Sequence, residues 1–181
     1  QLELLYWEGS VTMKITDVRV EHYRWPKTKP IANGKHTYTH NDLNLLVIDT
    51  DEGITGYGCS WAIEFAESMG KAIIGMDPLC NEQIFAKTYV PKFIGRRGTS
   101  AKTVSAIDMA VWDIKAKAAN LPLYKLLGGA RDRVDCYVAG GYYAPGKGIK
   151  ELQQEMDEYL SWGIHAVKMK VGGISMREDA A

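Results

Sequence analysis

The alternation of apolar and polar positions predicts that the first third of the chain consists mainly of β-strands. Period-two alternation of β-branched and aromatic residues predicts strands over residues 14–25, 42–50 and 54–61. A short Asp-Glu-Gly turn separates the last two strands, so we expect them to form a hairpin. Residues 26–40 contain two prolines and an Asn-Gly pair, which favours a loop. Gly56 and Gly58 mark a bulge or the close approach of another backbone.

The hydrophobic period then becomes helical. Apolar spacing, together with Gly, Asn and Pro at the segment ends, predicts helices over residues 63–74, 77–93, 101–119 and 123–127. The longest helix has one apolar face, which is typical of a helix that packs on a core. This face contains Val104, Ile107, Val111, Ile114 and Ala118.

The pattern changes again after residue 131. Two strands, at 134–139 and 165–171, enclose a glycine-rich loop and a helix over 149–162. A strand, a helix and a strand in this order form one β-α-β unit, so the two strands should be parallel. Residues 175–179 begin another helix, and we expect the chain to be a fragment of a longer parallel α/β array.

The amino-acid composition argues against several classes of protein. The chain has 22 Lys plus Arg and 22 Asp plus Glu, and this balance argues against a nucleic-acid binder or a membrane-surface binder. No apolar run approaches the ~20 residues of a transmembrane helix. Cys59, Cys80 and Cys136 are too widely spaced for a zinc site or a disulfide framework, so we expect a reducing, cytoplasmic setting. We expect Met13 to be the natural start and residues 1–12 to be a non-native or flexible arm, with a genuine N-terminal arm as the alternative.

Lys168 and Lys170 are the residues most open to a chemical role. Positions two apart share a face of a strand, and the simpler interpretation is a half-exposed strand with two solvated lysines. Parallel strands are, however, usually covered on both faces, and two neighbouring ammonium groups lower each other's pKa. A lysine in such a pair can act as a base near neutral pH.

Several segments together resemble the mandelate racemase/muconate lactonizing enzyme branch of the enolase superfamily. The resemblance rests on the order and spacing of residues 51–58, 106–117, 121–129 and 167–172, the last of which holds the K-x-K strand. It implies an α+β capping domain, with an antiparallel sheet plus helices, over residues 13–131. The start of a TIM-type (β/α) barrel, truncated after its first β-α-β unit, would then occupy residues 132–181.

The resemblance also implies roles for individual residues. Lys170 would be the base that removes the proton α to a carboxylate, and Lys168 would modulate its pKa and contact that carboxylate. Two loops of the cap, at residues 27–40 and 59–63, would select the substrate. They supply His36, Tyr38, His40 and Trp61 as candidate contacts. His36 and His40 lie in a loop with Pro and Gly, so we interpret them as loop histidines and not as a metal pair.

The cofactor implied by the resemblance is Mg²⁺, with its ligands expected beyond residue 181 and no metal site in this chain. The full-length protein would be a homo-oligomer acting on a small carboxylate, and dehydration of a sugar acid is the leading hypothesis. A racemase or epimerase, a muconate-type cycloisomerase, and an inactive fragment or non-catalytic cap module are the alternatives. We expect this chain alone to be inactive.

Other acidic residues have simpler interpretations. Asp108 and Asp113 are five positions apart on the long helix, so they do not share a face, and we expect salt bridges or capping contacts there. Glu151, Glu155 and Glu158 are expected to form a solvated helix face.

Overall fold

The structure, a computed structural model, describes residues 12–61, 64–89 and 98–180. Almost all of the predicted N-terminal arm therefore lies outside the described residues. The chain divides into two compact units, which are described separately. The first unit is Gln1–Tyr23 with Leu43–Ala130, and the second is Arg24–Asp42 with Arg131–Ala181.

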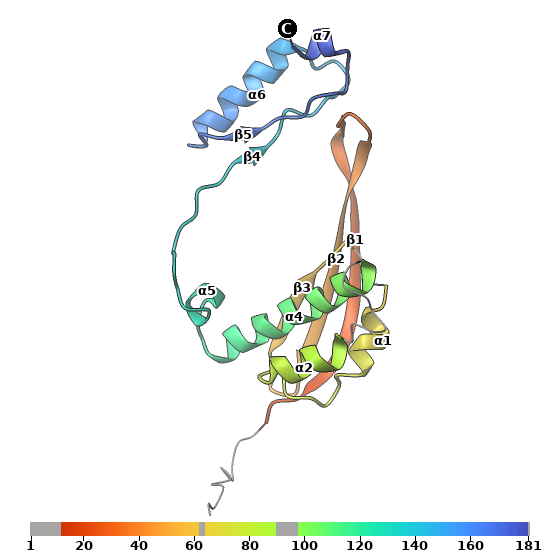
Figure 1. Ribbon diagram of the computed structural model, residues 1–181, viewed down its shortest axis with the longest axis vertical. Coiled ribbons are helices and arrows are strands. Elements are labelled where there is room, and N and C mark those ends of the chain that lie inside the picture. The colour runs from red at the N-terminus through yellow and green to blue at the C-terminus, as the bar shows by residue number, and fades with distance from the viewer. Residues whose placement is uncertain (1–11, 62–63, 90–97, 181) are drawn as a thin grey trace, which may run out of the picture. The chain divides into compact units, whose positions relative to one another are not determined.

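A three-stranded sheet with the order β1-β2-β3 forms one layer of the first unit (Figure 1). The strands are β1 (Ile15–Ala32), β2 (Thr37–Thr50) and β3 (Thr55–Cys59). β2 and β3 pair antiparallel with Val47 opposite Tyr57, which confirms the predicted hairpin. Gly53, at a φ of 73°, occupies the turn between them.

The loop predicted for residues 26–40 is wrong. β1 continues to Ala32 and β2 resumes at Thr37, so the two strands extend as a ribbon. Proline is tolerated there because β1 is an edge strand, where a missing N–H costs no ladder bond. Only the tip is a turn, in which Asn33 Oδ1 accepts hydrogen bonds of 2.8 Å from the backbone N–H groups of Lys35 and His36.

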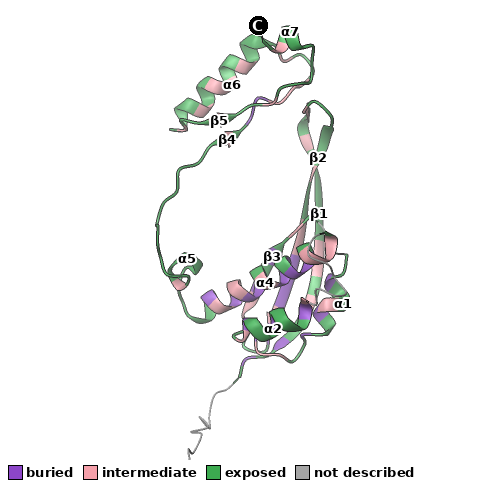
Figure 2. Cartoon of the chain, in the orientation of Figure 1, coloured by how far each residue is buried: buried purple, intermediate pink, exposed green. Residues whose placement is uncertain are grey.

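Helix α4 (Thr99–Ala118) packs on the sheet and completes the core. Val104, Ile107, Val111 and Ile114 are buried as predicted, whereas Ala118 is exposed because the helix extends past the sheet at its end. Gly56 and Gly58 lie against the backbone of Ala110 and Ala106, where a Cβ would overlap a carbonyl group. The prediction of close backbone approach at these two glycines is confirmed. The buried residues concentrate at this helix-sheet contact (Figure 2).

The other helices among the described residues of the first unit are shorter than predicted. They are α1 (Ala66–Lys71), α2 (Asn81–Thr88) and α5 (Leu123–Leu126). Asp77 does not start a helix, because its carboxylate accepts a hydrogen bond from the N–H of Leu79 and forms a turn before α2. The predicted residues at 63 and 90–93 lie outside the described residues.

The second unit contains the predicted β-α-β arrangement. β4 (Val138–Ala139) and β5 (Val167–Lys168) flank α6 (Ile149–Ser161), and α7 (Met176–Asp179) follows. The two strands pair parallel with Val138 opposite Val167, as predicted. Both are shorter than expected because each has one partner, and the backbone beyond them bonds to loops.

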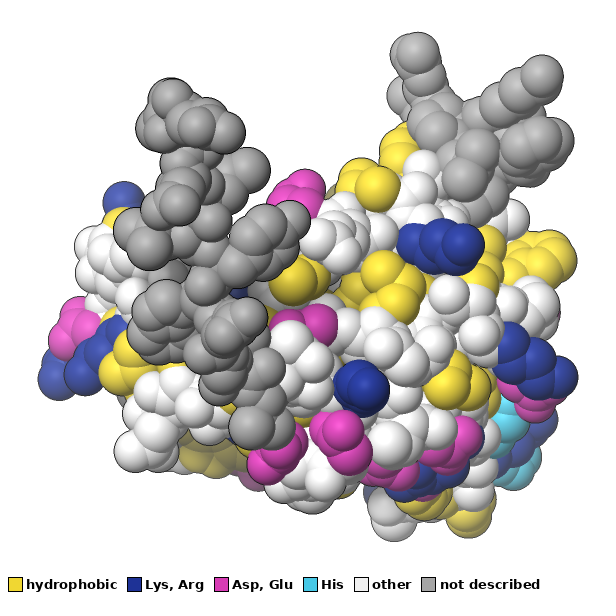
Figure 3. All heavy atoms as spheres, turned by 90° about the horizontal axis from the view of Figure 1, so that it is seen from below, with side chains coloured by type: hydrophobic (Ala, Val, Ile, Leu, Met, Phe, Trp, Pro, Cys, Tyr) yellow, Lys and Arg dark blue, Asp and Glu magenta, His cyan; other side chains and the backbone are white. Residues whose placement is uncertain are grey.

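The surface has mixed character. On the face shown in Figure 3, acidic and basic side chains are interspersed with hydrophobic ones, in keeping with the zero formal net charge. The three cysteines are free thiols. None of the described helices is long and apolar enough to cross a membrane.

Candidate active site

Lys168 and Lys170 lie where β5 gives way to a loop. Lys168 is the last residue of β5, and its carbonyl oxygen accepts a hydrogen bond of 3.1 Å from the N–H of Gly140. Lys170 lies beyond the strand, contrary to the prediction, and its N–H donates to the carbonyl oxygen of Gly141 at 3.4 Å. The glycine loop after β4 therefore holds the backbone on which the lysines sit.

The two ammonium groups rest on different aromatic rings. Lys168 Nζ lies 5.8 Å from the centroid of the Tyr137 ring, and Lys170 Nζ lies 4.9 Å from that of Tyr142. Lys168 is exposed and Lys170 is half-buried. The expectation that both faces of this strand are covered is therefore not met in the two-stranded sheet, and Lys170 is the more enclosed of the pair.

The tip of the β1-β2 ribbon lies beside this loop within the same unit. Ala32 and Tyr143 exchange two backbone hydrogen bonds, of 2.7 and 3.0 Å. At the tip, Asn33 Nδ2 donates to the hydroxyl of Tyr38 at 2.9 Å. This pairing fixes the ribbon tip against the loop that follows β4.

A chain of aromatic contacts joins the tip to Lys170. The rings of His36 and Tyr38 have centroids 6.3 Å apart, and those of Tyr38 and Tyr142 are 6.5 Å apart with an interplanar angle of 87°. Such edge-to-face pairs are favourable. The structure thus brings together Lys170, Tyr38 and His36, three of the predicted site residues, through Tyr142.

An open hollow of about 370 Å³ lies next to these aromatic contacts. His36 and Lys35 from the ribbon tip face Val171 and Gly172, which follow Lys170 directly. Gly172 has a φ of 84°, and its carbonyl group lies so close to Gly34 that a Cβ there would be 2.5 Å from the oxygen. Two glycines thus allow the ribbon tip and the lysine loop to meet.

Glu155 of α6 anchors the glycine loop from its other side. Its carboxylate accepts hydrogen bonds from the N–H of Gly141 at 3.2 Å, the hydroxyl of Tyr159 at 2.6 Å, and Lys147 Nζ. Burial works to raise the pKa of Glu155, but these three donors outweigh it and hold the pKa below its usual value. Burial and Glu155 together raise the pKa of Tyr159 to about 12. The expected solvated face is therefore wrong for Glu155, which has a structural role.

Asp179 of α7 anchors the lysine loop in the same way. One carboxylate oxygen accepts a hydrogen bond of 2.6 Å from the N–H of Gly172, and the other accepts one from the hydroxyl of Tyr143. The hydrogen bond to Asp179 raises the pKa of Tyr143. The loops after β4 and β5 are thereby tied to each other.

His40 and Trp61 have other surroundings. His40 Nδ1 is 2.9 Å from Thr39 Oγ1, and its side chain is exposed. Trp61 belongs to the first unit, where it is 84% exposed and its carbonyl oxygen contacts Asn44 Nδ2 at 3.5 Å. Part of the loop predicted at residues 59–63 lies outside the described residues.

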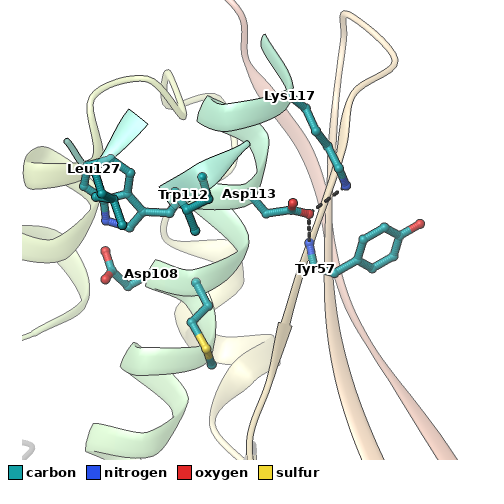
Figure 4. Close-up of a pocket in the computed structure, with 8 residues that line it drawn as sticks. Tyr57, Asp108, Trp112, Asp113, Lys117 and Leu127 are labelled. Atoms are coloured by element: carbon teal, nitrogen blue, oxygen red, sulfur yellow. Dashed lines mark hydrogen bonds and ion pairs between the residues drawn. The ribbon is translucent and has the colours of Figure 1, made fainter. Parts of the chain in front are cut away.

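A second hollow, of about 530 Å³, lies in the first unit beside α4 (Figure 4). Asp113 there pairs with Lys117 at 2.7 Å, so the predicted salt bridging is confirmed for Asp113. Asp108 points in another direction, and burial, with a smaller effect of Glu82, raises its pKa. Within the described residues, no three His, Cys, Asp or Glu side chains come together as a metal site.

A family model for the mandelate racemase/muconate lactonizing enzyme N-terminal domain matches residues 15–128. This match spans more than half of the chain. The chain belongs to the mandelate racemase/muconate lactonizing enzyme family. The predicted capping domain, with its antiparallel sheet and helices, is confirmed as that family's N-terminal domain.

Several relatives in the enolase superfamily are sugar-acid enzymes. Arabinonate dehydratase of Saccharolobus solfataricus is 36% identical over 141 residues, which is 73% of this chain and 38% of the relative. D-galactarolactone cycloisomerase of Agrobacterium fabrum is 32% identical over 175 residues, or 92% of this chain and 46% of the relative.

A solved structure of a sugar-acid dehydratase is also similar to this chain. L-talarate/galactarate dehydratase from Salmonella typhimurium superposes with a TM-score of 0.77 at 27% identity, covering 94% of this chain and 47% of that one. The same enzyme has been solved with Mg and L-lyxarohydroxamate. The chain thus spans less than half the length of these relatives.

The sequence patterns missed Tyr142, Tyr143, Asn33 and Asp179, the residues that assemble this region of the family fold. Two adjacent tyrosines inside a glycine-rich loop after a predicted strand were the available signal. Loops at strand ends often carry function, and this one contacts both the ribbon tip and the lysine loop.

Proposed function

We propose that this chain is the N-terminal part of a Mg²⁺-dependent enzyme that removes the α-proton of a carboxylate substrate, with dehydration of a sugar acid as its reaction. Lys170 is the base and Lys168 contacts the substrate carboxylate. The observation that carries the proposal is the convergence of Lys170 with Tyr38 and His36 of the ribbon tip. Sugar-acid dehydratases among the relatives support the reaction class.

The chemistry follows from the weak acidity of the α-proton. Transfer of this proton to a neutral Lys170 leaves an enediolate, whose added negative charge is stabilised by nearby cations such as Lys168. A general acid then protonates the β-hydroxyl, which leaves as water. The resulting enol becomes a keto acid. Polar and aromatic residues at the ribbon tip suit a hydroxylated substrate.

In this proposal the Mg²⁺ ligands come from outside the described residues of the chain. Mg²⁺ prefers carboxylate oxygens in near-octahedral geometry, and the described residues offer no cluster of three acidic or other ligating side chains. We assign the ligands to the part of the parent protein that corresponds to the rest of its relatives. The crystallised Salmonella enzyme, solved with Mg, supports that cofactor.

The second unit also supports a barrel that continues. Val171, Met176 and Ile149 are 72%, 91% and 64% exposed, although each is apolar. Parallel sheets normally have both faces covered, and a barrel closes its sheet completely. We propose that the remaining strands and helices of the parent cover this surface, and that the parent is a cytoplasmic homo-oligomer.

A cycloisomerase or racemase is the second candidate, favoured by the relative that is a galactarolactone cycloisomerase. The residue opposite Lys170 discriminates between them. A His-Asp pair supports a dehydratase or racemase, whereas a second Lys supports an epimerase or cycloisomerase. A non-catalytic cap is the remaining alternative.

The test begins with the coding sequence after the codon for Ala181. We expect it to encode acidic residues at the spacing of successive barrel strands, and the expressed full-length protein to convert a sugar acid to a keto acid in the presence of Mg²⁺. Isothermal titration should detect a Mg²⁺ site in the full-length protein and none of comparable affinity in this chain. A stop codon directly after Ala181, or tight Mg²⁺ binding by this chain, would contradict the account.

A further inference from the structure

Tyr142 is the residue through which the ribbon tip reaches Lys170. Its ring centroid is 4.9 Å from Lys170 Nζ, and its ring meets that of Tyr38 at an angle of 87°. The side chain is half-buried, so part of its surface is covered by these neighbours.

The backbone on both sides of Tyr142 is anchored. Before it, the N–H of Gly141 donates to Glu155, and the carbonyl oxygen of Gly141 accepts from the N–H of Lys170. After it, Tyr143 exchanges two backbone hydrogen bonds with Ala32 and donates its hydroxyl to Asp179. The backbone of Tyr142 is thereby fixed, and the edge-to-face contact with Tyr38 restrains the ring itself.

A fixed ring restrains the lysine above it. The four-carbon stem of a lysine is flexible, and an ammonium over an aromatic face is attracted by the ring quadrupole. We infer that Tyr142 is a positioning residue for Lys170, because its ring holds the lysine ammonium beside the ribbon tip. The edge-to-face contact with Tyr38 restrains the ring of Tyr142. This inference rests on the proposed function only for its catalytic consequence.

The contact itself can be tested without any activity. Protons above an aromatic ring resonate upfield, so in the NMR spectrum of this chain the Cε protons of Lys170 should lie upfield of those of the exposed Lys150. Lys170→Arg assigns the signal. Tyr142→Phe should keep the upfield shift, because the ring remains, and Tyr142→Leu should abolish it. An unshifted Lys170 signal in the unsubstituted chain, or a shift that survives Tyr142→Leu, would overturn the inference.

The catalytic consequence is tested in the full-length enzyme. Loss of the ring should lower kcat for α-proton exchange about two- to fivefold, because Lys170 gains positive charge as it takes the proton and the ring stabilises that charge. KM should change less than kcat, and Tyr142→Phe should restore the parental rate. Tyr124→Leu, a half-exposed tyrosine of α5, is the matched control. Equal losses in the Phe and Leu variants, or a change in KM alone, would contradict a positioning role.

The two failures are distinguishable. If Lys170→Ala retains full exchange, the proposed function is wrong, while the NMR shift still reports whether Tyr142 holds Lys170. If Lys170→Ala abolishes exchange and the Lys170 signal shows no ring-dependent shift, the proposed function stands and the positioning role is wrong.

Discussion

The backbone N–H of Tyr57 donates a hydrogen bond of 3.0 Å to Asp113 Oδ2. Tyr57 is on β3 and Asp113 is on α4, so the contact joins the edge of the sheet to its covering helix. Lys117 Nζ adds hydrogen bonds of 2.7 Å to Asp113 and to the carbonyl oxygen of Thr55. Two polar backbone groups of an exposed edge are thus satisfied, which protects the edge from pairing with another chain.

Loss of this edge contact should destabilise the cap. We predict that Asp113→Ala lowers the free energy of unfolding by about 1 kcal/mol, because the N–H of Tyr57 loses its charged acceptor. Urea unfolding followed by circular dichroism measures the change. Glu52→Ala, an exposed carboxylate in the β2-β3 turn, is the control and should stay within about 0.5 kcal/mol of the parent. Equal stability of the two variants would contradict the role given to Asp113.

Close packing of α4 on β3 gives a second prediction. Gly58→Ala should destabilise the first unit by about 1–3 kcal/mol, since the new Cβ would overlap the backbone of Ala106 and force the helix away. Cys59→Ala, at the next and exposed position, should have little effect. The unfolding midpoints of both variants test this. A neutral Gly58→Ala would show that the helix does not approach so closely.

Protonation of Glu155 should loosen the loop that carries Tyr142. The pKa of Glu155 is lower in the folded protein than its ordinary value of 4.5, so its stabilising effect is complete above that pH and is lost as the pH falls through the folded value. We predict that the amide signal of Gly141 shifts only below about pH 4.5. An NMR titration measures this shift. In Glu155→Gln the shift should be absent, and an unchanged titration in that variant would assign it to another group.

Exposed apolar residues of the second unit predict association of the isolated chain. Met176 is 91% exposed and Val171 is 72% exposed, and such surface binds hydrophobic dyes and other chains. Val171→Ser with Met176→Ser should reduce dye fluorescence and the apparent mass in analytical ultracentrifugation. The same pair of substitutions should destabilise the full-length protein, in which we place these residues in the interior. A monomeric parent chain that binds no dye would contradict this interpretation.

The sequence predicted those elements that are determined by residues close together along the chain. The β2-β3 hairpin follows from the alternation on either side of the Asp51-Gly53 turn, and α4 follows from its apolar spacing, with Ala118 as the exception. The ribbon was missed because Pro26 normally signals a loop, and only the strand order shows that it lies on an edge. The pattern of residue types along the chain does not show which strand lies at the edge of the sheet.

The candidate site was predictable only in part. The K-x-K pattern and the resemblance proposed Lys170 as a site residue, and the resemblance alone proposed Tyr38 and His36. Tyr142 was missed because its place depends on contacts with residues far away in the sequence, such as Ala32 near Tyr143. Long-range pairing of this kind is not encoded in periodicity. Trp61 belongs to the first unit, and its assignment to the same site stays a prediction.

Exchange of the substrate α-proton with D₂O tests the central claim most directly. In the full-length protein, Lys170→Ala should lower the exchange rate by about 10²–10⁴-fold, the usual contribution of a general base. Lys150→Ala, which removes an exposed lysine from α6, is the matched control and should exchange at the parental rate. Fast exchange in Lys170→Ala, with the parent and the control both active, would remove Lys170 from the role of base.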